Sequence, residues 1–474
     1  MVNAAPFRLP PVDEIVLSAS PGETRAATLR NGEVWGLAWD WPDAPNPVGA
    51  VHGVRITRLA PQARGAFVVV DGQGQEGFLD LAGLKTPPHE GQRLLAQVTR
   101  APEPGKRLTL SPAVRLAGRY LVYTPLRAGI SASRQISDKA VAQHLQGLVK
   151  SAARPGEGMI VRAAATAVAA TPDVLLAELE RHRAAWDAAS ASNALGIVIA
   201  APNLAEALLI ERASTGSLTV TVDAPALLAA CNAAASTWTP TEPITVSLDR
   251  TNPFASTGGD EAFTIAASTQ VPLATGGSLW LEPTRACWTA DVDSGNAQGP
   301  AEAVRFETNQ AAAIELARQI RLRQAAGAFI ADFLRLSDAK AQAAIIQTLR
   351  NAFADDPAPL RFNPGFDPLG FYAFSRGRIA PPFAARTAYG GHRQALLAGL
   401  RALVRTTLAN PTSRLALYLP AATIEAAAHL PIALQHTQDQ LGQTPVIQAD
   451  ASLRAGSYAV RPFRPKPPAH ETSA

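Results

Sequence analysis

Two aspartates, Asp291 and Asp332, stand near the ends of two short segments that are predicted to be β-strands. In residues 285–292 apolar and polar residues alternate, with Asp291 on the polar face; in residues 327–334 Asp332 shares one face with Ala328 and Ile330. Two carboxylates brought together repel each other unless a cation lies between them. An oxygen-only ligand set without Cys or His favours a hard ion, Mg²⁺ or Mn²⁺, over zinc. Such an ion can activate water or stabilise a phosphodiester transition state. The alternative is that each aspartate caps its strand or pairs with a nearby arginine.

The segment between the two strands has the period of a helix. Apolar residues recur at helical spacing from about residue 308 to residue 325. Thr308 or Asn309 is expected to cap its start, and Gly327 marks its end. A strand, a helix and a strand of this length form a parallel crossover, and ligands bind outside the carboxyl ends of such strands. The sequence therefore predicts that both aspartates face one site.

Three motifs in this region resemble the catalytic core of the RNase E/G family of endoribonucleases. The strand signature I-D-V-N-S/T-G corresponds to residues 290–295. The helix signature T-N-L-E-A-A-x-E-I-A-R-Q-L-R-L-R-D corresponds to residues 308–324, and the second strand G-G-x-x-x-I-D-F to residues 326–333. The resemblance implies a metal-dependent endoribonuclease that cleaves single-stranded RNA in RNA processing and decay.

The same resemblance implies that Asp291 and Asp332 are catalytic and hold Mg²⁺, with Mn²⁺ as the other candidate ion. Asp293 is expected to be a third catalytic residue. It stands where the family has Asn, and its extra charge could join the metal shell or perturb it. The alternative function is a non-catalytic RNA-binding or scaffold protein that retains the fold. The departures from the family pattern favour this alternative, and the presence of both metal aspartates argues against it.

The resemblance also implies an α/β and α+β multidomain fold. In it, a split RNase H-like subdomain carries an inserted OB-fold barrel of the S-one type and a five-prime sensor. A DNase I-like catalytic subdomain and a small C-terminal α/β domain follow. The expected boundaries are 1–35 (RNase H-like, first part), 36–118 (OB-fold), 119–215 (five-prime sensor), 216–279 (RNase H-like, second part), 280–385 (DNase I-like) and 386–474 (C-terminal domain).

Two aromatic residues of the expected barrel, Phe67 and Phe78, match positions on which the S-one module stacks RNA bases. Stacking on an aromatic ring is worth about 1–3 kcal/mol per base and tolerates many sequences. The alternative is that both rings belong to the barrel core. Lys106 and Arg107 lie in a basic turn that could contact phosphate, or that could be an ordinary solvated turn.

Further arginines match the family at positions near RNA. Arg162, in G-x-I-V-R, corresponds to an arginine of the pocket for the five-prime monophosphate of RNA, and a guanidinium suits a phosphate fork. The threonine that follows it in the family is Ala163 here, so one hydroxyl contact is lost. The arginines expected near the RNA backbone are Arg318, Arg321, Arg323 and Arg376.

The segment after Arg378 departs from the family. Its members carry a C-P-x-C pair there, which bridges two subunits through zinc, whereas residues 379–383 contain no cysteine. A shared tetrahedral site needs two thiolates from each subunit. No zinc is therefore expected, and a homodimer would form without a zinc bridge.

The composition is consistent with these expectations. A chain of 474 residues should hold about three or more domains. Its net charge of +4 and pI near 9.2 are compatible with a polyanionic partner. The two cysteines, Cys231 and Cys287, indicate a reducing compartment. The most apolar stretch, 195–210, contains Pro, Asn and Glu, so no membrane span is expected. The N-terminus has no signal-peptide pattern, and the expected location is the cytoplasm.

Overall fold

The computed structural model describes residues 10–82, 84, 86–100, 107–212, 217–236, 238, 244–383 and 391–463. These residues form two compact units. The first contains residues up to Ser18, Ala26–Ala38 and Asn46–Pro382; the second contains Ala19–Arg25, Trp39–Pro45 and the chain from Phe383 onward. Among the described residues, no helix is both long and apolar enough to cross a membrane.

A five-stranded sheet joins the start of the chain to segments far along it. Its order is β15-β14-β1-β2-β3, and β1 runs parallel to β14. The strands are β1 (Glu14–Ser20), β2 (Glu23–Arg30), β3 (Glu33–Asp40), β14 (Leu218–Val222) and β15 (Ile244–Leu248). Asn31 and Gly32 both have positive φ at the β2–β3 turn, as a two-residue hairpin turn requires. The later strand β14 completes the sheet beside β1.

A closed barrel follows, because β4 pairs with both β5 and β7. Its strands are β4 (Val51–Ala60), β5 (Gly65–Val69), β6 (Glu76–Asp80), β7 (Arg93–Arg100) and β8 (Leu108–Ser111). Alternate residues such as Val54, Val68 and Leu79 fill its core. The predicted OB-like barrel is therefore present. A later strand, β13 (Gly196–Ile199), adds to its edge at β4.

A third sheet has the order β11-β12-β10-β9. Its strands are β9 (Leu116–Ala117), β10 (Leu121–Thr124), β11 (Gly129–Ala132) and β12 (Gly158–Val161). The accompanying helices are α1 (Lys139–Ala152), α2 (Pro172–Ala191), α3 (Leu204–Arg212) and α4 (Pro225–Ala235). The buried carboxylate of Glu178 on α2 accepts hydrogen bonds from the backbone N–H groups of Arg119, Tyr120 and Leu121. This contact holds α2 against the start of β10.

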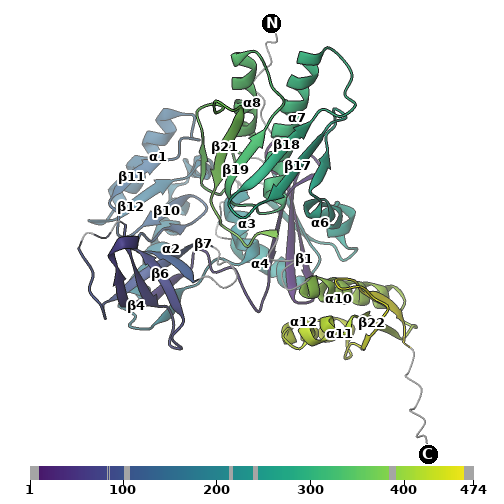
Figure 1. Cartoon of the computed structure of the whole chain (residues 1–474). Helices are drawn as coiled ribbons and strands as arrows, with labels where there is room; N and C mark the ends of the chain where they lie inside the picture. The colour runs from purple at the N-terminus through teal and green to yellow at the C-terminus, as the bar shows by residue number, and fades with distance from the viewer. Residues whose placement is uncertain are drawn as a thin grey trace, which may run out of the picture. The chain divides into compact units, whose positions relative to one another are not determined.

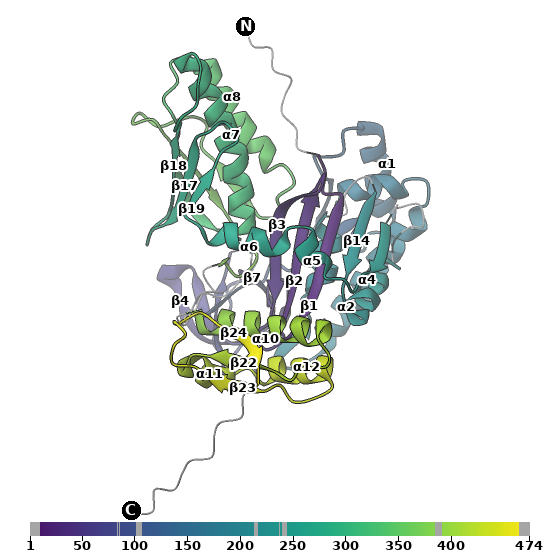
Figure 2. The same ribbon diagram turned by 90° about the vertical axis from the view of Figure 1, so that its right-hand side faces the viewer.

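The sheet that carries both aspartates has the order β16-β17-β18-β19-β21-β20. Its strands are β16 (Gln270–Pro272), β17 (Ser278–Pro283), β18 (Trp288–Asp293), β19 (Gly327–Asp332), β20 (Leu360–Phe362) and β21 (Phe371–Arg376). Helices α7 (Ala301–Leu322) and α8 (Ala339–Ala352) cover one of its faces, as Figures 1 and 2 show. Two short helices, α5 (Pro253–Ser256) and α6 (Gly259–Ala267), precede β16.

The start of α7 differs from the sequence-based expectation. The helix begins at Ala301, a full seven residues before Thr308, because residues 301–307 contain good helix formers and no Gly or Pro. Thr308 and Asn309 are therefore not caps; both are buried inside the helix. The strands and the parallel crossover between β18 and β19 are confirmed.

The second unit contains a three-stranded sheet of order β23-β22-β24. Its elements are α10 (His392–Ala409), β22 (Leu415–Leu419), α11 (Ala421–Ala427), α12 (Pro431–Leu441), β23 (Ile447–Ala449) and β24 (Ala459–Pro462). The predicted small α/β domain is thus present. Its α10 also binds the tip of the β1–β2 hairpin, where Arg401 forms an ion pair with the buried Glu23. Residues 19–25 and 39–45 belong to this unit for that reason.

Candidate active site

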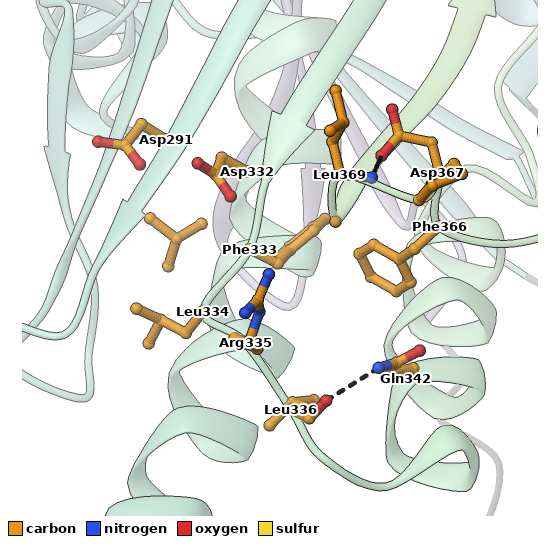
Figure 3. A pocket seen from close by; sticks show the side chains of 13 residues that line it. Asp291, Asp332, Phe333, Leu334, Arg335, Leu336, Gln342, Phe366, Asp367 and Leu369 are labelled. Carbon is orange, nitrogen blue, oxygen red and sulfur yellow. Dashed lines mark hydrogen bonds between the residues drawn. The ribbon is translucent and has the colours of Figure 1, made fainter.

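Asp291 and Asp332 lie directly opposite each other at the carboxyl ends of two neighbouring parallel strands. The register of β18 and β19 pairs Asp291 with Asp332, and both side chains are exposed. Adjacent strands lie about 4.8 Å apart, so the two carboxylates are neighbours. Figure 3 shows them next to each other. The predicted convergence of the two aspartates is confirmed.

The local sequence explains why both carboxylates face outward. Ala290, Val292 and Ala331 are buried under α7 and α8, so the residues between them point to the opposite face. The segment that follows Asp332 is held by Asn309 of α7. The Asn309 amide donates to the Leu334 carbonyl at 2.7 Å and accepts from the Leu334 N–H at 2.9 Å. This paired contact keeps the end of β19 in place beside the helix.

The electrostatics of the pair fit a bound cation. In the described part of the chain, neither carboxylate has a hydrogen-bond or ion-pair partner. Burial and, after it, the nearby Asp291 carboxylate raise the pKa of Asp332, while Arg335 lowers it. Among the described residues no cluster of three or more His, Cys, Asp or Glu could hold a metal. An ion at the pair would therefore take its other ligands from water and substrate, which is the usual behaviour of Mg²⁺.

The pair opens onto a cleft of about 620 Å³. Besides the two aspartates, its lining comprises Val292, Phe333, Leu334, Arg335, Leu336, Gln342, Phe366, Asp367, Pro368, Leu369 and Gly370. Arg335 is exposed and lies three residues after Asp332, so it brings a positive charge to the cleft (Figure 3). The Asp367 carboxylate accepts from the N–H groups of Leu369 at 3.0 Å and Phe371 at 2.8 Å. These two bonds shape the loop at residues 366–370, which forms one wall of the cleft.

Sequence reasoning missed two residues of this cleft, Arg335 and Asp367. The proximity of Arg335 to Asp332 in the sequence was one available signal. The other was the Asp-Pro pair at 367–368, which is typical of a turn start. Asp293, the third residue predicted to be catalytic, is not part of the cleft lining. Its carboxylate accepts from the Gly295 N–H at 2.9 Å and stabilises the turn after β18.

Three of the four arginines expected at the RNA backbone are buried, so this expectation is wrong for them. Arg376 is bonded by two of its nitrogens to Asp356 and by the third to the Ala325 carbonyl. Arg321 is 1% exposed and donates to Asp355 at 2.7 Å. Arg323 donates to the carbonyls of Leu281 and Ser268 and to Gln319. Burial lowers the pKa of Arg323 to about 10.

The fourth arginine, Arg318, is also engaged within the protein. Its guanidinium donates to the Val34 carbonyl at 2.8 Å and forms ion pairs with Glu315 and Glu33. Arg318 therefore ties α7 to the β2–β3 hairpin instead of facing RNA. These four arginines match the family motif, but in the structure they bond to other groups of the protein.

The two barrel aromatics lie outside the barrel core. Phe67 and Phe78 are half-buried, face each other across β5 and β6, and meet edge-to-face at 5.8 Å. Gly65 leaves room for the Phe78 ring, because a Cβ there would come within 2.1 Å of it. The Arg58 guanidinium lies 4.5 Å from the centre of the Phe67 ring and that of Arg107 lies 5.4 Å from it. Lys106, which was expected to contact phosphate, lies outside the described residues.

Arg162 occupies the end of β12, beside the first strands of the third sheet. Its guanidinium donates to the carbonyls of Gly118 at 3.0 Å and Ile210 at 3.3 Å, and lies 3.6 Å from Glu211. Arg162 thus links β12 to α3 while part of its side chain stays accessible. Ala163, the next residue, begins a short 3₁₀ turn. A role in binding a five-prime phosphate remains a prediction.

The sequence model of the Ribonuclease E/G family matches residues 115–379, which include both aspartates and the whole crossover between them. The chain belongs to the Ribonuclease E/G family.

Relatives with known names agree with this assignment at low identity. Ribonuclease G of Haemophilus influenzae is 23% identical over 393 residues, which cover 77% of this chain and 79% of the relative. Ribonuclease G of Escherichia coli is 24% identical over 400 residues, covering 77% and 80%. Ribonuclease E of Escherichia coli is 27% identical over 391 residues, which cover 76% of this chain but only 36% of the relative.

Proposed function

We propose that this protein is a divalent-metal-dependent endoribonuclease that cleaves single-stranded RNA in RNA processing and decay. The observation that carries the proposal is the pair of unpartnered carboxylates, Asp291 and Asp332, at neighbouring parallel strand ends in an open cleft. These two residues would hold Mg²⁺ or Mn²⁺, with no zinc bridge between copies. When bound, the ion would stabilise charge on the scissile phosphate and lower the pKa of an attacking water.

The remaining residues of the cleft would bind and orient the strand. Arg335 supplies a positive charge on the same side as the acid pair, where it can attract a phosphate. The outer face of the barrel, with Phe67, Phe78 and the arginines around them, supplies stacking surfaces for unpaired bases. Such surfaces favour single strands, whose bases are free to stack.

A non-catalytic RNA-binding protein is the competing function. Part of its support was Asp293, which stands where the family has Asn. Because Asp293 stabilises a turn and lies outside the cleft lining, this departure leaves the acid pair unchanged. The structural placement of Asp293 therefore favours the enzyme.

Three labelled oligonucleotides of one AU-rich sequence test the proposal: single-stranded RNA, the same RNA in a duplex, and single-stranded DNA. We expect internal cuts in the single-stranded RNA with Mg²⁺ present, and little or no cutting of the other two. Binding of the RNA without any cut, at several Mg²⁺ and Mn²⁺ concentrations, would instead support the non-catalytic function.

Removal of both barrel aromatics should weaken RNA binding. If Phe67 and Phe78 each stack one base, Phe67→Ala with Phe78→Ala should cost roughly 2–5 kcal/mol of binding free energy. Fluorescence anisotropy with a labelled single strand measures the loss. Because both rings lie outside the barrel core, circular dichroism should show a folded protein. The matched control is Phe67→Tyr with Phe78→Tyr, which keeps both rings and should bind normally. Normal binding by the folded alanine variant would refute the stacking role.

We expect a small preference for a five-prime monophosphate over a five-prime hydroxyl. Arg162 can still offer one charge-assisted contact, but Ala163 lacks the hydroxyl of its relatives, a loss worth about 1.5–3 kcal/mol. Ala163→Thr should therefore enlarge the preference and Arg162→Ala should erase it. The measurement compares cleavage rates of two forms of one oligonucleotide that differ only at the five-prime end. Equal rates in the wild type and in Ala163→Thr would show that this region does not sense the end.

A further inference from the structure

A row of five side chains crosses the catalytic sheet at the level of the acid pair. The strand registers pair Gln270 with Trp280, Trp280 with Asp291, Asp291 with Asp332, and Asp332 with Phe371. Directly paired residues on neighbouring strands point to the same face. Their sequence neighbours Leu279, Leu281 and Tyr372 are buried on the opposite face, under α7 and α8. The two aspartates are thus flanked by an aromatic ring on each side.

Trp280 is unusually open for a residue of its size. Its side chain is 37% exposed, and within the described residues the indole has no aromatic, cationic or hydrogen-bonding partner. Trp288, on the next strand, behaves differently: it stacks on Phe329 at 6.3 Å and packs against the core. An exposed indole beside two carboxylates therefore has no evident structural role in this sheet.

The surface around Trp280 is mostly polar: Gln270 lies beside it on β16, and Asp291 lies beside it on β18. The next row of the same face runs from Glu282 through Thr289 and Ile330 to Ala373. Ile330 is 38% exposed, while the residues on either side of it are small. Figures 1 and 2 show α7 and α8 on the other face of these strands. The indole is therefore open on the face of the sheet that α7 and α8 do not cover.

The position of Trp280 next to Asp291 indicates which kind of molecule binds to the exposed indole. Trp280 is one strand from Asp291, a spacing of about 4.8 Å, which is less than the length of one nucleotide. A folded protein partner seated on the indole would also cover Asp291 and close the site. The occupant that fits is part of the substrate itself. The cleft with Arg335 lies toward β21, whereas Trp280 lies on the β17 side of the pair.

We propose that Trp280 is a substrate-binding residue on which the base of a nucleotide flanking the scissile phosphate stacks. This inference rests on the proposed ribonuclease function. An RNA strand whose scissile phosphate lies at the acid pair must extend over both sides of it. One side enters the cleft, and the base on the other side meets the indole. Because stacking does not depend on the hydrogen-bonding groups of a base, any base can bind there. Removal of the base should therefore weaken the interaction, whereas a change of base should not.

The test combines Trp280→Ala with RNAs that carry an abasic nucleotide on one side or the other of the mapped cut, as in a double-mutant cycle. In the wild type, an abasic nucleotide on one side should lower kcat/KM by roughly 5- to 150-fold, equivalent to about 1–3 kcal/mol for one stacked base. Trp280→Ala should show the same loss with intact RNA and no further loss with that abasic RNA. Trp280→Phe retains a ring and should keep most of the effect. Leu408→Ala, which removes another exposed apolar side chain, should behave as wild type.

Anisotropy measurements with the same RNAs, made without metal, give a second readout that needs no cleavage. If the wild type cuts no RNA, the proposed function fails. The inference is then decided by binding alone: it holds if Trp280→Ala weakens the binding of intact RNA but not that of the abasic RNA. Equal losses for all RNAs, or no loss, would overturn the inference. A change of oligomeric state of Trp280→Ala in size-exclusion chromatography, without coupling, would show that a second copy of the chain covers the indole and would also overturn it.

Discussion

Asp332→Asn and Asp291→Asn will each abolish RNA cleavage while leaving RNA binding nearly intact. The amide has almost the shape of the carboxylate but carries no charge, so it holds a divalent cation far less strongly. We expect kcat to fall by at least ~10³-fold, more than the 10- to 100-fold typical of residues that only support a metal ligand. Both side chains are exposed and without partners, so neither substitution removes a contact that holds the fold.

The stability of Asp332→Asn provides a second readout. The pKa of Asp332 is raised in the folded protein, so its ionised form opposes folding at neutral pH. The Asn variant should therefore be as stable as the wild type or slightly more so. Asp293→Asn is the matched control, because its amide oxygen can still accept the bond from Gly295. Cleavage by either metal-site variant near the wild-type rate would contradict the assignment.

Arg376→Ala will destabilise the first unit strongly. Arg376 forms two bonds of 3.0 Å to Asp356, whose side chain is completely buried. Removal of one member of a buried ion pair leaves the other charge uncompensated and costs about 3–5 kcal/mol. Denaturant unfolding, followed by circular dichroism, measures the loss of unfolding free energy.

The control for Arg376 is Arg361→Ala on the neighbouring strand β20. Arg361 is exposed, so its removal should change the unfolding free energy by less than about 0.5 kcal/mol. Replacing both Arg376 and Asp356 with apolar residues should recover part of the lost stability, because both charges of this pair are then removed together. Unchanged stability of Arg376→Ala together with weaker RNA binding would restore the role that the sequence suggested for this residue.

The strands and the acid pair could be predicted because their signal is local. Alternation around Asp291 and Asp332 fixes which face each side chain takes, and the length of the segment between them requires a parallel crossover. The barrel was predictable for the same reason, since its short strands alternate and are separated by turn residues. Phe67 and Phe78 could be assigned to either face from sequence, and the structure places them outside the core.

The arginines of α7 and β21 could not be assigned from sequence, because a motif gives residue types but not burial. Asp355 and Asp356, the carboxylates that bond Arg321 and Arg376, come from a loop outside the motif. Asp367 was missed because it meets the acid pair only when the loop before β21 folds back. The row from Trp280 to Phe371 depends on strand register, which a single sequence leaves open.

The most direct test of the account is cleavage of a labelled single-stranded RNA by the wild-type protein with its metal removed and then restored. After treatment with EDTA and exchange into metal-free buffer, we expect intact binding and no cleavage. Addition of Mg²⁺ or Mn²⁺ should restore internal cuts in the wild type but not in Asp291→Asn with Asp332→Asn. Two results would contradict the claim that these two carboxylates hold the catalytic ion. One is cleavage by the wild type without metal; the other is cleavage by the double variant after metal is restored.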